Sequence, residues 1–171
     1  FEVPESYTGP HKVRAQISST FYADADFTVE PGLTVSLKKG PVGTNVTVEG
    51  HGFAEDEKDI ELRYYLDSTN YQTIAENIEA DEDGWWKKSF PIPASAKGSH
   101  KIDAKGEVST LSQVKDATFE VAPGISLDKS SGSVGENITM TGNGFYANDT
   151  HITILFAGQE VETDIRADAK G

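Results

Sequence analysis

The chain has 171 residues and carries 28 acidic against 15 basic side chains, a formal net charge of −13. This charge argues against a nucleic-acid partner, because neutralising phosphates requires clustered Lys and Arg. The absence of cysteine excludes disulfides, thiol catalysis and cysteine-ligated zinc, and no stretch has the apolar length of a membrane span. Since the first residue is Phe1 and not Met, we expect the sequence to be a piece of a longer polypeptide.

Residues 1–30 are predicted to form the C-terminal part of a repeat unit. Residues 1–15 resemble residues 90–104, with Phe, Pro, Ser, Gly, His, Lys and Ala at matching places. Residues 25–29 resemble residues 117–121 in the same way, if the intervening loop is three residues longer in the later copy. We therefore expect this segment to supply the last strands of a unit.

Residues 31–122 are predicted to form a complete unit, and residues 123–171 the N-terminal part of a further unit. The sequence of residues 31–64 recurs without a gap as residues 123–156, a period of 92 residues. Most of the recurring positions are glycines and small or apolar residues: Pro31, Gly32, Gly40, Val42, Gly43, Asn45, Thr47, Gly50, Gly52, Phe53 and Ile60. A fixed period indicates a tandem array, and each unit is long enough to bury its own core.

The complete unit is predicted to consist of short β-strands. Alternating or continuous apolar residues between turn signals predict strands at 33–37, 46–48, 60–66, 71–78, 85–92, 99–104 and 117–121. Residues 40–43 are predicted to form a turn, and residues 81–84, which end in Asp-Gly, a hairpin turn. No segment has helical periodicity, so the pattern predicts an all-β Greek-key sandwich.

One face of each strand is predicted to point into the core and the other toward solvent. The core positions are Val46, Val48, Phe53, Ile60, Leu62, Tyr64, Trp86, Phe90, Ile102 and Phe119. The junctions at 29–32 and 121–124 are short, so we expect neighbouring units to be closely tethered, with limited hinge freedom.

Two motifs carry a resemblance to a known family. Residues 40–53, G-P-V-G-T-N-V-T-V-E-G-H-G-F, and residues 132–145, G-S-V-G-E-N-I-T-M-T-G-N-G-F, resemble the opening of IPT/TIG-like repeats. Residues 81–104 resemble the closing half of such repeats in large cell-surface and S-layer-type proteins of archaea and bacteria. The resemblance implies tandem immunoglobulin-like Greek-key β-sandwich domains in an extracellular structural or adhesive protein, and it implies no catalytic residue.

The sequence does not predict an enzyme. It contains no G-x-S-x-G motif, no Ser close to His and Asp, and no phosphate loop. His11 and His100 occupy the same repeat position, but neither has a second His or a carboxylate pair nearby in the sequence. A structural or surface role is therefore favoured for both over a metal-binding or catalytic one.

One acidic cluster raises the question of calcium. Asp81 and Asp83, with Glu82 between them, could supply carboxylate oxygens to a calcium ion. A turn is the favoured interpretation, because calcium loops need more ligands, and the corresponding residues 168–171 keep one carboxylate of the three. We therefore expect no cofactor, with calcium left open as a possibility.

Three sequons are candidate sites of N-glycosylation. Asn45 and Asn137 begin Asn-x-Thr at the same repeat position, and Asn148 begins a third. Their recurrence favours use of some of them if the protein is exported. The alternative is that Asn and Thr simply occupy the outward face of the strand.

Aromatic side chains offer a possible contact for sugars or for another protein. Trp85 and Trp86 are adjacent on a predicted strand, so they point to opposite faces and at most one joins the core. The other, Trp85, or Tyr71 could stack on a sugar or pack at an interface.

The sequence as a whole predicts a structural cell-surface protein, extracellular in location. We expect an Ig-like repeat unit of an S-layer, sheath or extracellular filament that acts as a spacer and assembly module. Its expected partners are copies of itself or neighbouring repeats, head-to-tail, and it could also bind surface glycans. Residues 1–30 and 123–171 could complement each other between chains, or each could be completed within a longer array. The alternative function is an adhesin or carbohydrate-binding module.

Overall fold

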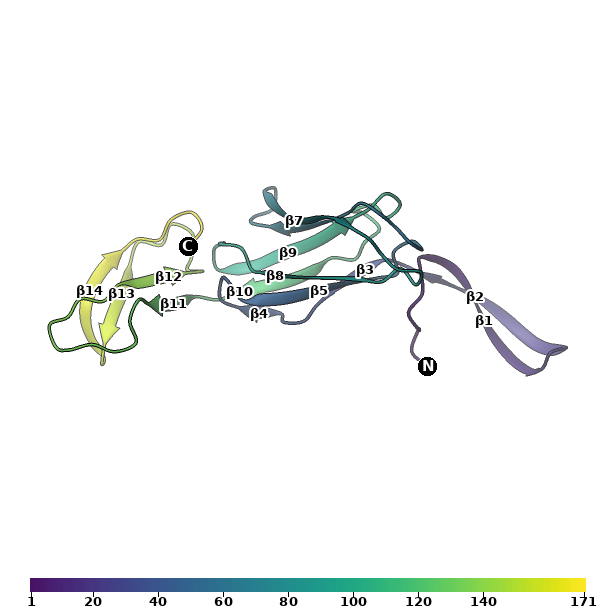
Figure 1. Ribbon diagram of the computed structural model, residues 1–171, viewed down its shortest axis with the longest axis horizontal. Coiled ribbons are helices and arrows are strands. Elements are labelled where there is room, and N and C mark those ends of the chain that lie inside the picture. The colour runs from purple at the N-terminus through teal and green to yellow at the C-terminus, as the bar shows by residue number, and fades with distance from the viewer.

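The computed structural model describes all 171 residues, which form 14 β-strands and no helix. Figure 1 shows three parts in a row: a hairpin on the N-terminal side, a central unit with two facing sheets, and a C-terminal unit. The order of the parts in the row is their order in the chain.

The central unit is a sandwich of a three-stranded and a five-stranded sheet. The smaller sheet has the order β3-β5-β8, formed by Gly32–Val35, Asn45–His51 and Trp86–Pro91. The larger has the order β4-β10-β9-β6-β7, formed by Lys39–Gly40, Ala117–Val121, Gly98–Lys105, Ile60–Tyr65 and Tyr71–Ile78. Each of the seven predicted strand segments corresponds to one of these strands.

Side chains that alternate along the strands fill the space between the two sheets. In β5, Val46 and Val48 are buried, whereas Asn45 is exposed and Thr47 half-buried. Seventeen hydrophobic residues form one core cluster. All ten predicted core positions belong to this cluster, so the predicted core is confirmed.

The turn at residues 81–84 differs from the prediction in what it connects. The Gly84 N–H donates a hydrogen bond to the Asp81 carbonyl (2.9 Å), and Gly84 has a φ of +74°, so the turn itself is tight. It joins β7 in the larger sheet to β8 in the smaller one. The predicted hairpin is therefore wrong, because β8 pairs with β5, with Trp86 opposite Gly50.

The segment at residues 40–43 was predicted only as a turn, but it contains part of a strand. Lys39–Gly40 forms β4, which lies parallel to β10 in the larger sheet. The first part of the unit thus contributes β3 to one sheet and β4 to the other. This change of sheet, together with the crossover from β7 to β8, gives an immunoglobulin-like Greek-key sandwich.

The N-terminal hairpin is a pair of strands without an opposing sheet. It consists of β1 (Gly9–Ser18) and β2 (Phe21–Val29), which pair with each other and with no third strand. Their sequence counterparts β9 and β10 lie between β4 and β6 in the central unit. Phe27 is 44% exposed, whereas its counterpart Phe119 is fully buried.

The C-terminal unit repeats the first strands of the central unit. In it β11 (Gly124–Leu127) pairs with β12 (Met140–Asn143), and β13 (Ile152–Phe156) pairs with β14 (Gln159–Ile165). These pairs correspond to β3 with β5 and to β6 with β7. No strand occupies the places that β8, β9 and β10 take in the central unit. The protein is thus all-β and is built from tandem immunoglobulin-like Greek-key β-sandwich units.

Candidate functional site

The asparagines of all three sequons are exposed. Asn45 is the first residue of β5, and Asn137 lies in the loop before β12. Asn148 lies in the loop before β13 with a φ of +58°, a conformation that Asn tolerates better than most residues. Each amide side chain is thus open to solvent, as attachment of a glycan requires.

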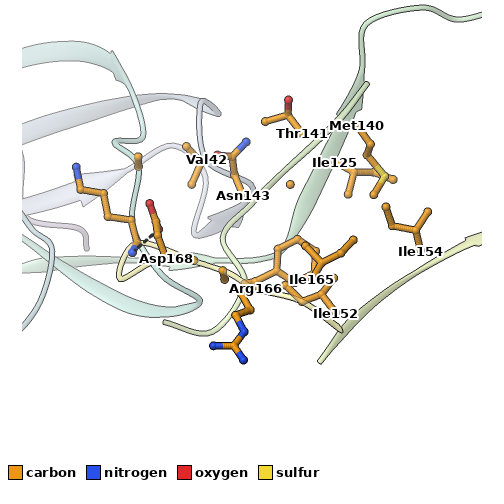
Figure 2. Close-up of a pocket in the computed structure, with 16 residues that line it drawn as sticks. Val42, Ile125, Met140, Thr141, Asn143, Ile152, Ile154, Ile165, Arg166 and Asp168 are labelled. Atoms are coloured by element: carbon orange, nitrogen blue, oxygen red, sulfur yellow. Dashed lines mark hydrogen bonds between the residues drawn. The ribbon is translucent and has the colours of Figure 1, made fainter. Parts of the chain in front are cut away.

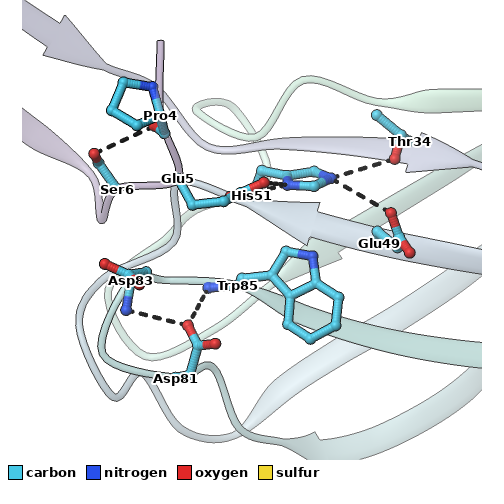
Figure 3. A network of polar contacts seen from close by, with 9 residues as sticks. All are labelled: Pro4, Glu5, Ser6, Thr34, Glu49, His51, Asp81, Asp83 and Trp85. Carbon is cyan, nitrogen blue, oxygen red and sulfur yellow. Dashed lines mark hydrogen bonds and ion pairs between the residues drawn. The ribbon is translucent and has the colours of Figure 1, made fainter.

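Asp81 and Asp83 both lie in the turn between β7 and β8. The Asp81 Oδ1 atom accepts hydrogen bonds from the Asp83 N–H (3.1 Å) and the Trp85 N–H (2.9 Å), as Figure 3 shows. The carboxylate therefore stabilises the turn through its own backbone. No group of three or more His, Asp or Glu side chains in the structure is placed to hold a metal ion.

The two tryptophans point to opposite faces, as strand alternation predicts. Trp86 is 2% exposed and packs edge-on against Phe53, with 5.4 Å between ring centroids. Trp85 is half-buried on the other face, where the Lys87 Nζ lies 5.3 Å from the centre of its ring. Tyr71 begins β7, whereas Trp85 follows the turn beyond its far end, so the two candidate aromatics do not share one platform.

The outer face of the larger sheet carries a layer of paired charges. Arg63 donates two hydrogen bonds to Glu61, from Nε to Oε1 (2.8 Å) and from Nη2 to Oε2 (2.7 Å). These bonds lower the pKa of Glu61 to about 2. The guanidinium of Arg63 lies 4.4 Å from the centre of the Tyr71 ring, and the rings of Tyr65 and Tyr71 are 5.4 Å apart.

A second ionic group lies beside the first on the same face. The Lys101 Nζ is 2.7 Å from Asp103 Oδ2 and 3.7 Å from Asp116 Oδ2, and 4.1 Å from the centre of the Tyr65 ring. Asp103 is fully buried, and its Oδ1 has no hydrogen-bond partner. The charged side chains on this face therefore pair mainly with one another. The aromatic side chains beside them are Tyr65 and Tyr71.

The recurring histidines close a turn, in agreement with the structural role favoured above. The Nε2 of His100 is 2.7 Å from the Ala96 carbonyl, and the Nε2 of His11 is 2.8 Å from the Tyr7 carbonyl, the same contact in both units. The Nδ1 of His100 also lies 2.9 Å from the Tyr65 carbonyl.

The ring of His100 stacks on Tyr64 inside the central unit, with 5.3 Å between centroids. Tyr64 is fully buried, and its hydroxyl is 2.9 Å from the Ser95 Oγ. Burial raises the pKa of Tyr64 to about 12, so the phenol is neutral at physiological pH. Both rings therefore serve the fold.

Glu57 has a structural role that the sequence did not predict. It is 3% exposed, although it lies in the acidic loop between β5 and β6, where Glu55, Asp56 and Asp59 are exposed. Its carboxylate accepts hydrogen bonds from the backbone N–H groups of Ala54 (2.9 Å), Val108 (2.9 Å) and Ser109 (2.7 Å), and from the Ser109 hydroxyl (2.7 Å). The one available signal was recurrence of an acidic residue at this repeat position, as Asp149.

The inner face of the C-terminal unit is an open apolar surface. It borders a cavity of about 440 Å³, whose apolar lining includes Ile125, Met140, Ile152, Ile154 and Ile165 (Figure 2). The counterparts of the first four in the central unit are Leu33, Val48, Ile60 and Leu62, each 0–7% exposed. Ile125, by contrast, is 64% exposed. The difference arises because β8, β9 and β10 cover this face only in the central unit.

The cavity also extends across the junction between units. Val42 and Ala94 of the central unit contribute to its lining, beside residues of the C-terminal unit. Figure 2 shows Val42 facing Asn143 across this boundary. The junction and the open apolar face are thus neighbouring surfaces.

The comparison with known families bears on this C-terminal unit. The family profile described as IPT/TIG domain matches residues 124–169. The chain has an IPT/TIG-like, immunoglobulin-like fold. No curated protein and no solved structure matches the chain significantly. The matched IPT/TIG-like segment includes most of the second copy of the sequence that opens the central unit, which agrees with a tandem arrangement.

Two further points concern the fold of these IPT/TIG-like units and the absence of a membrane-spanning helix. Folds of this kind are typically non-catalytic modules, and the polar groups described above are mostly engaged in turns and internal ion pairs. The structure contains no helix that is both long and apolar enough to cross a membrane.

Proposed function

We propose that the chain is a structural protein of the cell surface, in which IPT/TIG-like repeats act as spacers and assembly modules of an S-layer, sheath or extracellular filament. The observation that carries this proposal is that the two copies of the repeat share residues of the core and differ on the outer face. Several positions shared between copies, such as Gly50, Phe53 and Ile60, are buried in the central unit. The outer face varies instead, with Leu155 and Ala157 in the places of Arg63 and Tyr65.

An extracellular location fits the surface of the molecule. The acidic surface keeps repeated units soluble and apart, and the exposed sequon residues Asn45, Asn137 and Asn148 would carry glycans after export. We therefore propose that this is a glycoprotein of the cell exterior.

For assembly, we propose that the β1–β2 hairpin of a second copy covers the open face of the C-terminal unit. The central unit supplies the template, because its β9 and β10 occupy this place and are the sequence counterparts of the hairpin. In that template β9 pairs with β6, so β1 would pair with β13. Such head-to-tail strand addition would bury Phe27 as Phe119 is buried.

Analytical ultracentrifugation over a range of concentrations tests this assembly. We expect the wild-type chain to associate as its concentration rises, and the Phe27→Lys variant to remain monomeric, because it places a charge at a position that becomes buried. The matched control is Thr28→Lys, which adds the same charge at the neighbouring position, whose counterpart Glu120 is exposed. A wild-type chain that is strictly monomeric at high concentration would rule out exchange between copies. The partial units would then be completed by neighbouring segments of one polypeptide.

An adhesin or carbohydrate-binding module is the alternative, and one observation favours it. Tyr71 is 44% exposed, and its ring is held by Arg63 and Tyr65 on the outer face of the larger sheet. An aromatic ring fixed in this way can stack on a sugar.

A glycan array distinguishes the alternative from a spacer. The spacer function predicts that the wild-type chain binds no glycan. Binding that is lost in Tyr71→Ala and retained in Trp85→Ala would instead place a carbohydrate site on this face and replace the proposed function.

A further inference from the structure

Both junctions between units are made by the same main-chain hydrogen bond. At the first junction the Thr8 N–H donates to the Phe53 carbonyl (2.8 Å), and at the second the Lys97 N–H donates to the Phe145 carbonyl (2.8 Å). Thr8 and Lys97 occupy the same repeat position, each directly before the glycine that begins a strand. The phenylalanines are likewise counterparts. The contact is therefore formed twice in one chain by equivalent atoms.

A glycine at each junction allows the next unit to approach closely. A Cβ atom added to Gly52 would lie 2.9 Å from both the Val29 Cγ1 and the Glu30 carbonyl oxygen. Gly52 also has a φ of +67°, a conformation that favours glycine.

The second junction repeats this arrangement. A Cβ added to Gly144 would lie 2.9 Å from the Val121 Cγ1 and 2.8 Å from the Ala122 carbonyl oxygen, and Gly144 has a φ of +70°. In both cases the last strand and the linker of one unit leave no room for a side chain on the next.

The turn at residues 81–84, and its counterpart at residues 168–171, hold the backbone of the junction phenylalanine in each unit. The Phe53 N–H donates to the Gly84 carbonyl (3.0 Å), and the Phe145 N–H donates to the Gly171 carbonyl (2.9 Å). The phenylalanine whose carbonyl accepts the junction bond is thus also held by a turn of its own unit.

Side-chain contacts at the two junctions, in contrast, differ. At the first, Glu5 pairs with His51 (2.9 Å), as Figure 3 shows, but their counterparts at the second are Ala94 and Asn143. At the second, the Lys97 Nζ lies 4.5 Å from the centre of the Tyr146 ring, and the counterparts at the first are Thr8 and Ala54. Because the side chains change while the main-chain contacts stay the same, the main chain sets the junction.

We propose that each repeat carries its own docking site for the preceding unit. In the central unit this site is the surface around Gly52 and Phe53. Its partner is the Thr8–Gly9 backbone and the linker of any repeat of this type. Successive units then follow one another with a constant rotation and translation, so the array is a stiff rod and not a string of independently tumbling domains. This inference deepens the proposed spacer function, since a stiff rod fixes the distance that it spans.

Distances between two labels in one chain test the proposal. The chain has no native cysteine, so spin labels can be placed at Thr20→Cys and Ser68→Cys across the first junction, and at Ser68→Cys and Gln159→Cys across the second. All three positions are exposed. We expect one narrow distance distribution for each pair in electron–electron double resonance.

Gly52→Ala and Gly144→Ala should broaden the distribution across their own junctions. The matched control is Gly43→Ala, because Gly43 also has a positive φ (+82°) but an added Cβ would meet no atom within 4 Å. A broad distribution in the wild-type chain, or equal broadening by Gly43→Ala and Gly52→Ala, would overturn the proposal.

Amide hydrogen exchange provides a second test that needs no substitution. We expect slowed exchange at the Thr8 and Lys97 N–H groups, which have no partner other than the next unit. Free exchange at both would overturn the proposal even if the glycine variants fail to fold.

In the spin-label experiment, dilution of labelled chains with unlabelled ones keeps the distance measurement independent of self-association. A flexible junction would therefore be distinguishable from a failure of the head-to-tail assembly.

Discussion

Replacing Trp86 with alanine is expected to lower the free energy of unfolding of the central unit by about 3–5 kcal/mol. The indole is 2% exposed and lies edge-on to Phe53 in the middle of the core. It also packs directly over Gly50, where any Cβ would collide with the ring. Removing the ring leaves a cavity that strands held in two hydrogen-bonded sheets cannot close.

The neighbouring tryptophan provides a matched control for this prediction. Trp85→Ala removes a ring of the same size from the half-buried outer face, and we expect a loss of less than about 1 kcal/mol. Trp86→Phe should also cost less than Trp86→Ala, because it keeps much of the apolar volume and removes an indole N–H that has no partner. Urea denaturation followed by circular dichroism measures all three. Equal losses for Trp85→Ala and Trp86→Ala would contradict the assignment of Trp86 to the core.

Glu57→Ala is expected to lower the free energy of unfolding by about 3–4 kcal/mol, because it leaves three backbone N–H groups without an acceptor in a buried site. Two of those groups belong to Val108 and Ser109 in the loop between β9 and β10. The variant should therefore also accelerate amide exchange in that loop, which nuclear magnetic resonance can resolve.

Glu55→Ala is the control for Glu57→Ala. Glu55 lies two residues away in the same acidic loop, but it is exposed. We expect its replacement to change stability by no more than about 0.5 kcal/mol. If the two variants lost equal stability, the effect would come from the net charge of the loop and not from the hydrogen bonds of Glu57.

Periodicity explains why the core could be predicted from the sequence. Val46 and Val48 alternate with polar residues on β5, and the repeat shows which apolar positions the second copy preserves. Alternation likewise assigns Trp85 and Trp86 to opposite faces of their strand from the sequence alone. Such local patterns depend only on the direction in which successive side chains point along a strand.

Contacts between distant segments could not be predicted in the same way. The Asp-Gly pair at residues 83–84 indicates a tight turn, but which strand receives β8 depends on the fit of Trp86 over Gly50. The two-residue strand β4 exists because β10 lies beside it. Apart from the acidic residue at its repeat position, nothing in the sequence indicated that Glu57 is buried, because most of the donors that its carboxylate binds belong to a loop some fifty residues later in the chain.

The candidate site was predictable only in part for the same reason. The sequons and the aromatic residues could be located, but the pairing of Tyr71 with Tyr65 and Arg63 depends on the register of β6 and β7. The junction was expected to be tight because the linkers are short. The hydrogen bonds that equivalent backbone atoms form at both junctions became visible only in three dimensions.

The use of backbone atoms at the junctions has a consequence for evolution. Mutations can alter side chains such as Glu5 or Tyr146 freely, while the geometry between consecutive copies is inherited unchanged. A recombination event that inserts or deletes one whole copy therefore lengthens or shortens the molecule by one step without redesign of any surface. The length of such an array is then set by the number of repeats that its gene encodes, on which selection can act directly.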